Sequence, residues 1–175
     1  MLRRGCSRVG VFLVIVISLM GLLGCDRIDS SNGVMVDEPF PELTLTTLDG
    51  EPFIMDALRG QVVIVKLWAT WCGVCRETEP QFKTFARQLD DEVVVASVSV
   101  DGDLNLVREY LLDRPNDFVQ LFDKNMIQSK SVLNAYVIPQ VYIIDKLGVL
   151  KYYTAGGVEW DGDMLKTINR IKEGY

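Results

Sequence analysis

Two cysteines three residues apart carry the clearest chemical signal in the sequence. Cys72 and Cys75 follow a β-branched run and open a segment with helical spacing of apolar residues. At a helix N-terminus, free N–H groups and the helix dipole favour an anion, so we expect a lowered thiol pKa for Cys72. Cys75 lies one turn further on, where it can close a small disulfide ring. Such a pair can alternate between dithiol and disulfide by thiolate attack.

Two other interpretations of the cysteine pair stay open. It could be half of a zinc site, but zinc needs about four ligands. The sequence has no histidine, and the remaining cysteines, Cys6 and Cys25, fall in the N-terminal segment. A purely structural disulfide is the other alternative, although so short a loop contributes little chain entropy. Redox exchange is the favoured interpretation, and we expect no metal and no cofactor beyond a Cys72–Cys75 disulfide.

The amino-acid composition excludes several other functions and kinds of catalysis. The chain has 175 residues and a formal net charge of −6, a length that suits one domain of ordinary size. Because the net charge is negative, the sequence lacks the excess of basic residues that is typical of nucleic-acid-binding proteins. Because histidine is absent, His-based general base catalysis and haem attachment through Cys-x-x-Cys-His are excluded. Catalysis must depend on carboxylates, lysines or cysteines.

The first 24 residues are predicted to be a signal peptide. Met1–Arg8 is short and basic, and Val9–Gly24 is an uncharged run of 16 residues. That run is shorter than the roughly 20 residues that a bilayer span needs, which is typical of a secretory signal. Leu22–Cys25 resembles the bacterial lipobox, which predicts cleavage before Cys25 and lipid attachment to its sulfur. An uncleaved anchor with a chance cysteine is the alternative.

The residues after Cys25 predict the membrane to which the protein is anchored. Asp26 resembles the inner-membrane retention signal of enterobacterial lipoproteins. Residues 25–38 are mostly polar and lack periodicity, so we expect a flexible membrane tether. The folded domain is then expected to begin near Pro39 and to continue to residue 175. These features together predict a lipid-anchored protein of the bacterial cell envelope, on the periplasmic face of the inner membrane.

Strands and helices are expected to alternate in the domain, which predicts an α/β fold with helices on both faces of a sheet. A hairpin turn at Asp49-Gly50 joins the first strand to a second at 53–54. Helical spacing follows the cysteines as far as Leu89 and returns at the C-terminus from Met164. The other expected strands are 43–48, 62–67, 93–100, 118–122, 141–144 and 149–154, and the other expected helices are 104–112 and 127–136.

From residue 39 to the C-terminus, several motifs resemble the TlpA/ResA/CcmG-like thioredoxins in order and spacing. They are Phe40-Pro41-Glu42-Leu43, Asp49-Gly50, Leu58-Arg59-Gly60, VVIVKLWATWCGVCR, Ile138-Pro139 and Ile143-Ile144-Asp145 with Gly148. The resemblance implies a thioredoxin-like fold with a central mixed sheet and an N-terminal β-hairpin. It also implies a membrane-tethered thiol–disulfide oxidoreductase. Most such proteins are reductants supplied by a DsbD/CcdA-like membrane electron donor, and their clients are envelope protein disulfides such as those of apocytochrome c.

The resemblance also assigns roles at the site. Cys72 matches the attacking cysteine and Cys75 the resolving cysteine. Trp71 matches the aromatic side chain beside the thiol, and Pro80 matches the proline that kinks the active-site helix. Pro139 matches a proline whose preceding peptide bond is cis and which packs against the disulfide.

The sequence departs from the family pattern at several positions. Gln140 replaces the usual threonine, and Gly73-Val74 replaces the Gly-Pro of thioredoxin. Lys66 occupies the position of a buried aspartate in thioredoxin, and Thr78 that of a glutamate in the ResA-like relatives. Both acids that would help to deprotonate the resolving cysteine are therefore missing.

A local substitute for these acids is possible. Glu79 lies four residues after Cys75 and shares roughly its helical face. We expect Lys66 and Glu79 to approach each other beneath Cys75 and to tune its pKa, since a buried ammonium is costly unless paired. The alternative is that Lys66 extends to solvent and Glu79 is an ordinary surface acid.

Two other functions remain possible at this stage. The same cysteines, held oxidised, would make the protein a disulfide donor or isomerase, which only the reduction potential distinguishes. A lipoprotein that binds a metal ion or a partner without catalysis is the third possibility.

Overall fold

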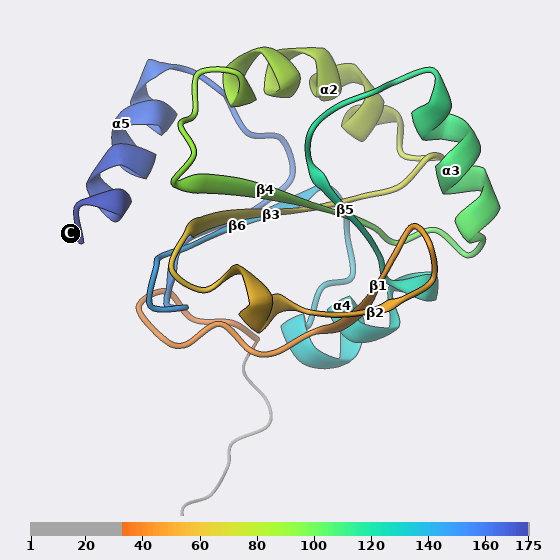
Figure 1. Ribbon diagram of the computed structural model, residues 1–175, viewed down its shortest axis with the longest axis horizontal. Coiled ribbons are helices and arrows are strands. Elements are labelled where there is room, and N and C mark those ends of the chain that lie inside the picture. Colours follow the sequence, from red (N-terminus) through yellow and green to blue (C-terminus); the bar gives the residue numbers. More distant parts are fainter. Residues whose placement is uncertain (1–32, 175) are drawn as a thin grey trace, which may run out of the picture. The chain divides into compact units, whose positions relative to one another are not determined.

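The computed structural model describes residues 33–174 (Figure 1). The predicted signal peptide, the lipid site at Cys25 and most of the predicted tether lie outside the described residues. Among the helices that are described, none is long and apolar enough to cross a membrane.

Seven strands form one mixed sheet with the order β2-β1-β5-β4-β3-β6-β7. The pairs β3/β4 and β4/β5 are parallel, and β1/β2, β1/β5, β3/β6 and β6/β7 are antiparallel. The predicted N-terminal hairpin is therefore confirmed as β1/β2, which extends one edge of the sheet. The strands are β1 (Thr44–Thr47), β2 (Pro52–Ile54), β3 (Val62–Trp68), β4 (Val93–Ser99), β5 (Val119–Phe122), β6 (Gln140–Ile144) and β7 (Leu150–Ala155).

Helices cover both faces of the sheet, as predicted. In Figure 1, α2 and α5 lie over one face and α4 lies over the other. The α-helices are α2 (Gly73–Ala86), α3 (Leu104–Leu112), α4 (Ile127–Leu133) and α5 (Gly162–Lys172), and two 3-10 helices, η2 (Met55–Leu58) and η3 (Lys124–Met126), complete the set in the described part of the chain.

The central strand β3 divides the core into two halves. Its seven residues are all buried, since β4 and β6 pair on both of its edges and helices lie on both faces. Val62 and Ile64 belong to the apolar cluster that includes Phe82 of α2, whereas Val63 and Val65 belong to the other cluster. Alternation along a strand therefore turns Lys66 toward α2.

Several boundaries differ from the sequence prediction: α2 ends at Ala86 rather than near Leu89, some strands shift by one residue, and two differences have a clear physical cause. Helix α4 ends at Leu133 rather than near residue 136, because Asn134 adopts a left-handed conformation at its C-cap (φ 56°). The domain also begins before Pro39, so the last part of the predicted 25–38 tether is packed. Val34 lies against the core, and the N–H of Asp37 donates to the carbonyl of Leu150 at 2.7 Å.

Candidate active site

The end of β3 and the start of α2 position the two cysteines. Strand β3 ends at Trp68, and four residues later Cys72 is the N-cap of α2. Its sulfur forms a disulfide with Cys75 and also accepts a hydrogen bond from the N–H of Cys75 at 3.2 Å. The predicted placement of Cys72 at a helix N-terminus is confirmed. This location stabilises a thiolate on Cys72 once the disulfide is reduced.

A buried aspartate anchors the loop that leads to Cys72. The Asp101 carboxylate accepts hydrogen bonds from the N–H of Thr70 at 3.0 Å and from its hydroxyl at 2.6 Å. It accepts a third from the Ser99 hydroxyl at 2.7 Å. Asp101 is not among the residues predicted from the sequence, although an acid directly after a buried strand was a usable signal. Asp101 links β4 to the active-site loop and fixes the approach to the cysteines.

Burial differs sharply around the disulfide. Cys72 is 7% exposed and Cys75 3%, whereas Trp71 is 65% exposed and Val74 51%. The larger exposed fraction of Cys72 agrees with the prediction that Cys72 is the more accessible of the two cysteines. Large apolar side chains on either side of Cys72 therefore face solvent, which is costly in a monomer and typical of a surface that binds partners.

The predicted cis peptide bond before Pro139 is confirmed. Strand β6 starts at the next residue, and Gln140 pairs with Leu67 near the end of the antiparallel strand β3. The segment before β6 therefore emerges at the edge of the sheet where β3 leads into the cysteine loop. Tyr136 and Val137 in this segment are exposed. Packing of Pro139 against the disulfide stays a prediction.

A small cavity lies beneath Cys75. Its volume is about 20 Å³, and Lys66, Cys75 and Glu79 all line it. Lys66 is 6% exposed, and its Nζ lies 4.5 Å from the centre of the Phe82 ring. The alternative in which Lys66 extends to solvent is therefore wrong. Lys66 and Glu79 thus line the same cavity as Cys75, and their joint tuning of the Cys75 pKa stays a prediction.

Glu79 nevertheless has other partners than Lys66. One of its oxygens forms an ion pair with Lys83 at 2.9 Å, and the other accepts a hydrogen bond from the Tyr110 hydroxyl at 2.9 Å. Burial lowers the pKa of Lys66 to about 8; Glu79 opposes this shift, and Lys83 adds to it. Burial, together with the bond to Glu79, raises the pKa of Tyr110 to about 12.

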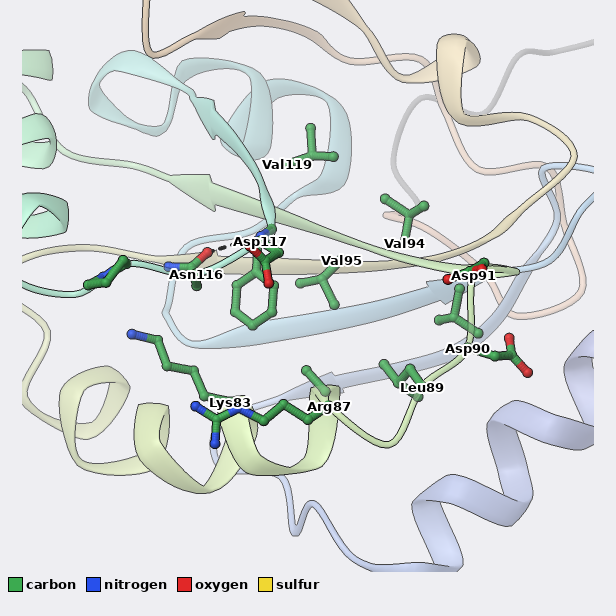
Figure 2. Close-up of a pocket in the computed structure, with 14 residues that line it drawn as sticks. Lys83, Arg87, Leu89, Asp90, Asp91, Val94, Val95, Asn116, Asp117 and Val119 are labelled. Carbon is green, nitrogen blue, oxygen red and sulfur yellow. Dashed lines mark hydrogen bonds between the residues drawn. The ribbon is translucent and has the colours of Figure 1, made fainter.

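A second, larger cavity lies away from the cysteines. It is an open groove of about 630 Å³ between the last turns of α2 and the beginnings of β4 and β5. Figure 2 shows Lys83 of α2 and Arg87, the C-cap of this helix, on one side of the groove, and Asn116 and Asp117 on the other. Asn116 and Phe118 line both the groove and the small cavity. Among residues 33–174, no group of three or more His, Cys, Asp or Glu side chains could hold a metal ion.

The sheet is mixed, a Cys-x-x-Cys disulfide lies at the N-terminus of the helix after its central strand, and a cis-proline precedes β6. These features together define a thioredoxin-like thiol–disulfide oxidoreductase. The chain belongs to the Redoxin family, whose model matches residues 35–171.

Curated relatives support the same class. The chain is 27% identical over 145 residues to the thioredoxin-like protein YneN of Bacillus subtilis, covering 79% of this chain and 84% of the relative. It is 27% identical over 154 residues to the thiol:disulfide interchange protein DsbE of Escherichia coli K12, covering 83% of this chain and 81% of that protein.

Solved structures share the fold. A putative thiol:disulfide interchange protein DsbE from Chlorobium tepidum matches with a TM-score of 0.67 and 22% identity, over 79% of this chain and 98% of that chain. The exposed lipoprotein thioredoxin Etrx1 of Streptococcus pneumoniae TIGR4 matches with a TM-score of 0.63 and 23% identity, over 74% and 99%. At these identities the likeness establishes the thioredoxin-like fold alone.

Proposed function

We propose that this protein is a membrane-tethered oxidoreductase of the bacterial cell envelope that reduces disulfides in client proteins such as apocytochrome c. The observation that carries the proposal is the Cys72–Cys75 disulfide at the start of α2, with exposed Trp71 beside it. An exposed apolar side chain next to a reactive sulfur can hold a client while its disulfide is attacked.

The reaction proceeds in two exchanges. The Cys72 thiolate attacks one sulfur of the client disulfide, and the other client sulfur leaves as a thiolate. Cys75 then attacks the Cys72 sulfur, which releases the second client thiolate and forms the Cys72–Cys75 disulfide. Two electrons pass to the client. A DsbD/CcdA-like membrane thiol donor returns the protein to its dithiol form.

Four exposed apolar side chains form the proposed client surface: Trp71, Val74, Tyr136 and Val137. The first two flank Cys72, and the other two precede the cis peptide bond at the same edge of the sheet. An unfolded client with an apolar segment around its disulfide would cover this surface on binding.

The location rests on the sequence and the relatives. The apolar run before Cys25 and the lipobox-like residues support export and lipid attachment at Cys25. One structural relative is itself described as an exposed lipoprotein thioredoxin, and several curated relatives are described as thiol:disulfide interchange proteins DsbE. Asp26 and the resemblance to tethered reductants support a position on the periplasmic face of the inner membrane.

Reduction of insulin by dithiothreitol tests the catalytic claim. The protein should accelerate it, and Cys72→Ser should abolish the acceleration. Cys75→Ser should accumulate a mixed disulfide with its client, because the resolving thiol is missing, and mass spectrometry of that complex would identify the client. If the purified protein instead oxidises a reduced peptide and leaves insulin intact, it is a disulfide donor or isomerase.

A further inference from the structure

Lys66 is a buried charged side chain for which the two exchanges above provide no role. It lies on β3, paired with Ser97 of β4 on one side and with Val141 of β6 on the other. Its side chain is turned toward α2 and lines the cavity that also touches Cys75 and Glu79. A lysine in this position shares a small cavity with the cysteine whose thiol must lose a proton before it can attack.

The Lys66 ammonium is not neutralised by an acid. Both oxygens of Glu79 are bound, one by Lys83 and the other by Tyr110. Within residues 33–174, Lys66 takes part in no ion pair, and its Nζ lies against the Phe82 ring. A buried ammonium without a counter-ion gives up its proton readily, so a neutral amine is accessible near physiological pH.

We infer that Lys66 accepts the proton of Cys75 when the mixed disulfide is resolved, a role that rests on the proposed function. The Cys75 thiol gives its proton to the neutral Lys66 amine, directly or through one water molecule, for which the cavity volume suffices. The Cys75 thiolate then attacks the Cys72 sulfur. The bond from Cys72 to the client breaks, and the client sulfur leaves with the electron pair.

A proton taken up by Lys66 must return to solvent. Asn116 and Phe118 line both the small cavity and the open groove shown in Figure 2, so they form the wall between them. Neither cysteine lines that groove. In this proposal the proton returns to water past these two side chains, into a groove that neither cysteine lines.

The titratable groups around Lys66 determine the direction in which substitutions should shift its pKa. On α2, Glu79 raises the pKa of Lys66 and Lys83 lowers it. On α3, Tyr110 stays neutral because its own pKa is about 12. The neighbours of Lys66 on β4 and β6 are Ser97 and Val141, which do not titrate in this range. Glu79→Gln should thus lower the pKa of Lys66, and Lys83→Met should raise it.

The experiment follows the reaction of the reduced protein with the aromatic disulfide DTNB. The first thionitrobenzoate released reports attack by Cys72, and the second reports attack by Cys75 on the mixed disulfide. Stopped-flow rates of the second release are measured from about pH 6 to about pH 10. We expect an inflection near the Lys66 pKa of about 8, shifted down in Glu79→Gln and up in Lys83→Met.

Substitution of Lys66 gives the direct comparison. Lys66→Met should slow the second release at pH 7 by about tenfold or more, since a positioned base contributes about 10²–10⁴-fold. Lys66→Arg keeps the charge but cannot accept a proton, so it should be slow as well. If Lys66→Arg retains the full rate, or if both variants do, Lys66 is not the proton acceptor.

Controls separate the two proposals. A wild-type protein that releases no thionitrobenzoate at all would contradict the proposed function. A normal first release with a second release whose inflection is the same in wild type, Glu79→Gln and Lys83→Met would overturn the inference about Lys66 alone. If circular dichroism shows that the Lys66 variants do not fold, the pH inflections of wild type, Glu79→Gln and Lys83→Met still test whether Lys66 accepts the proton.

Discussion

Replacement of Asp101 by alanine should destabilise the domain strongly, because this carboxylate fixes the loop before Cys72. Asp101 is 1% exposed and accepts three hydrogen bonds, two from Thr70 and one from Ser99. Each hydrogen bond to a charged group contributes about 1.5–3 kcal/mol, and the contributions are not additive. Since alanine also leaves the buried Ser99 hydroxyl and two half-buried Thr70 donors without an acceptor, we expect a loss of about 3–5 kcal/mol in the free energy of unfolding.

Urea unfolding of the oxidised protein, followed by tryptophan fluorescence, measures this loss at constant m-value. Asp103→Ala is the matched control, because Asp103 is an exposed N-cap that accepts one hydrogen bond from the N–H of Asn105. It should cost only about 1 kcal/mol. A loss below about 1 kcal/mol for Asp101→Ala, or one no greater than that of Asp103→Ala, would refute the view that Asp101 anchors the active-site loop.

Three further predictions concern the thiols, the anchor and the buried lysine. Alkylation of the reduced protein near neutral pH should label Cys72 before Cys75, and peptide mass spectrometry showing the reverse order would exchange their roles. The mature protein should begin at an acylated Cys25; an N-terminus at Met1, or unchanged membrane association of Cys25→Ala, would contradict this. The pKa of Lys66 is lowered from 10.5 to about 8, so the unfolded chain binds more protons between these values and stability should rise with pH across that window. In Lys66→Met this rise should disappear, and the pKa difference corresponds to a gain in stability at pH 7 of up to about 3 kcal/mol. Equal pH dependence of the two proteins in urea unfolding would contradict this prediction.

The elements that sequence predicted best are those whose pattern is local. The β-branched runs of β3 and β4 and the apolar face of α3 (Leu104–Leu112) predicted their elements to within one residue. The Cys72-x-x-Cys75 pair likewise predicted its own position at a helix N-terminus. The predicted C-terminal end of α4 was wrong because Asn134, in a left-handed conformation, ends the helix. The sequence does not mark this end, since Asn is tolerated both in helices and directly after them.

What the sequence could not supply are contacts between distant segments. Asp101 acquires its role only because β4 lies beside β3 and brings it to Thr70, 31 residues away in the chain. The bond between Tyr110 and Glu79 depends in the same way on the packing of α3 against α2. The ion pair between Glu79 and Lys83, by contrast, has i,i+4 spacing and could have been anticipated.

The reduction potential of the Cys72–Cys75 couple tests the central claim most directly. Equilibration of the protein in glutathione buffers of graded potential, followed by thiol alkylation and mass spectrometry, gives the fraction reduced. We expect a single reversible two-electron transition below about −200 mV, toward the value of about −270 mV for thioredoxin, and no transition in Cys72→Ser. A potential near that of the oxidant DsbA, about −120 mV, or a disulfide that never equilibrates with glutathione, would contradict a reducing role.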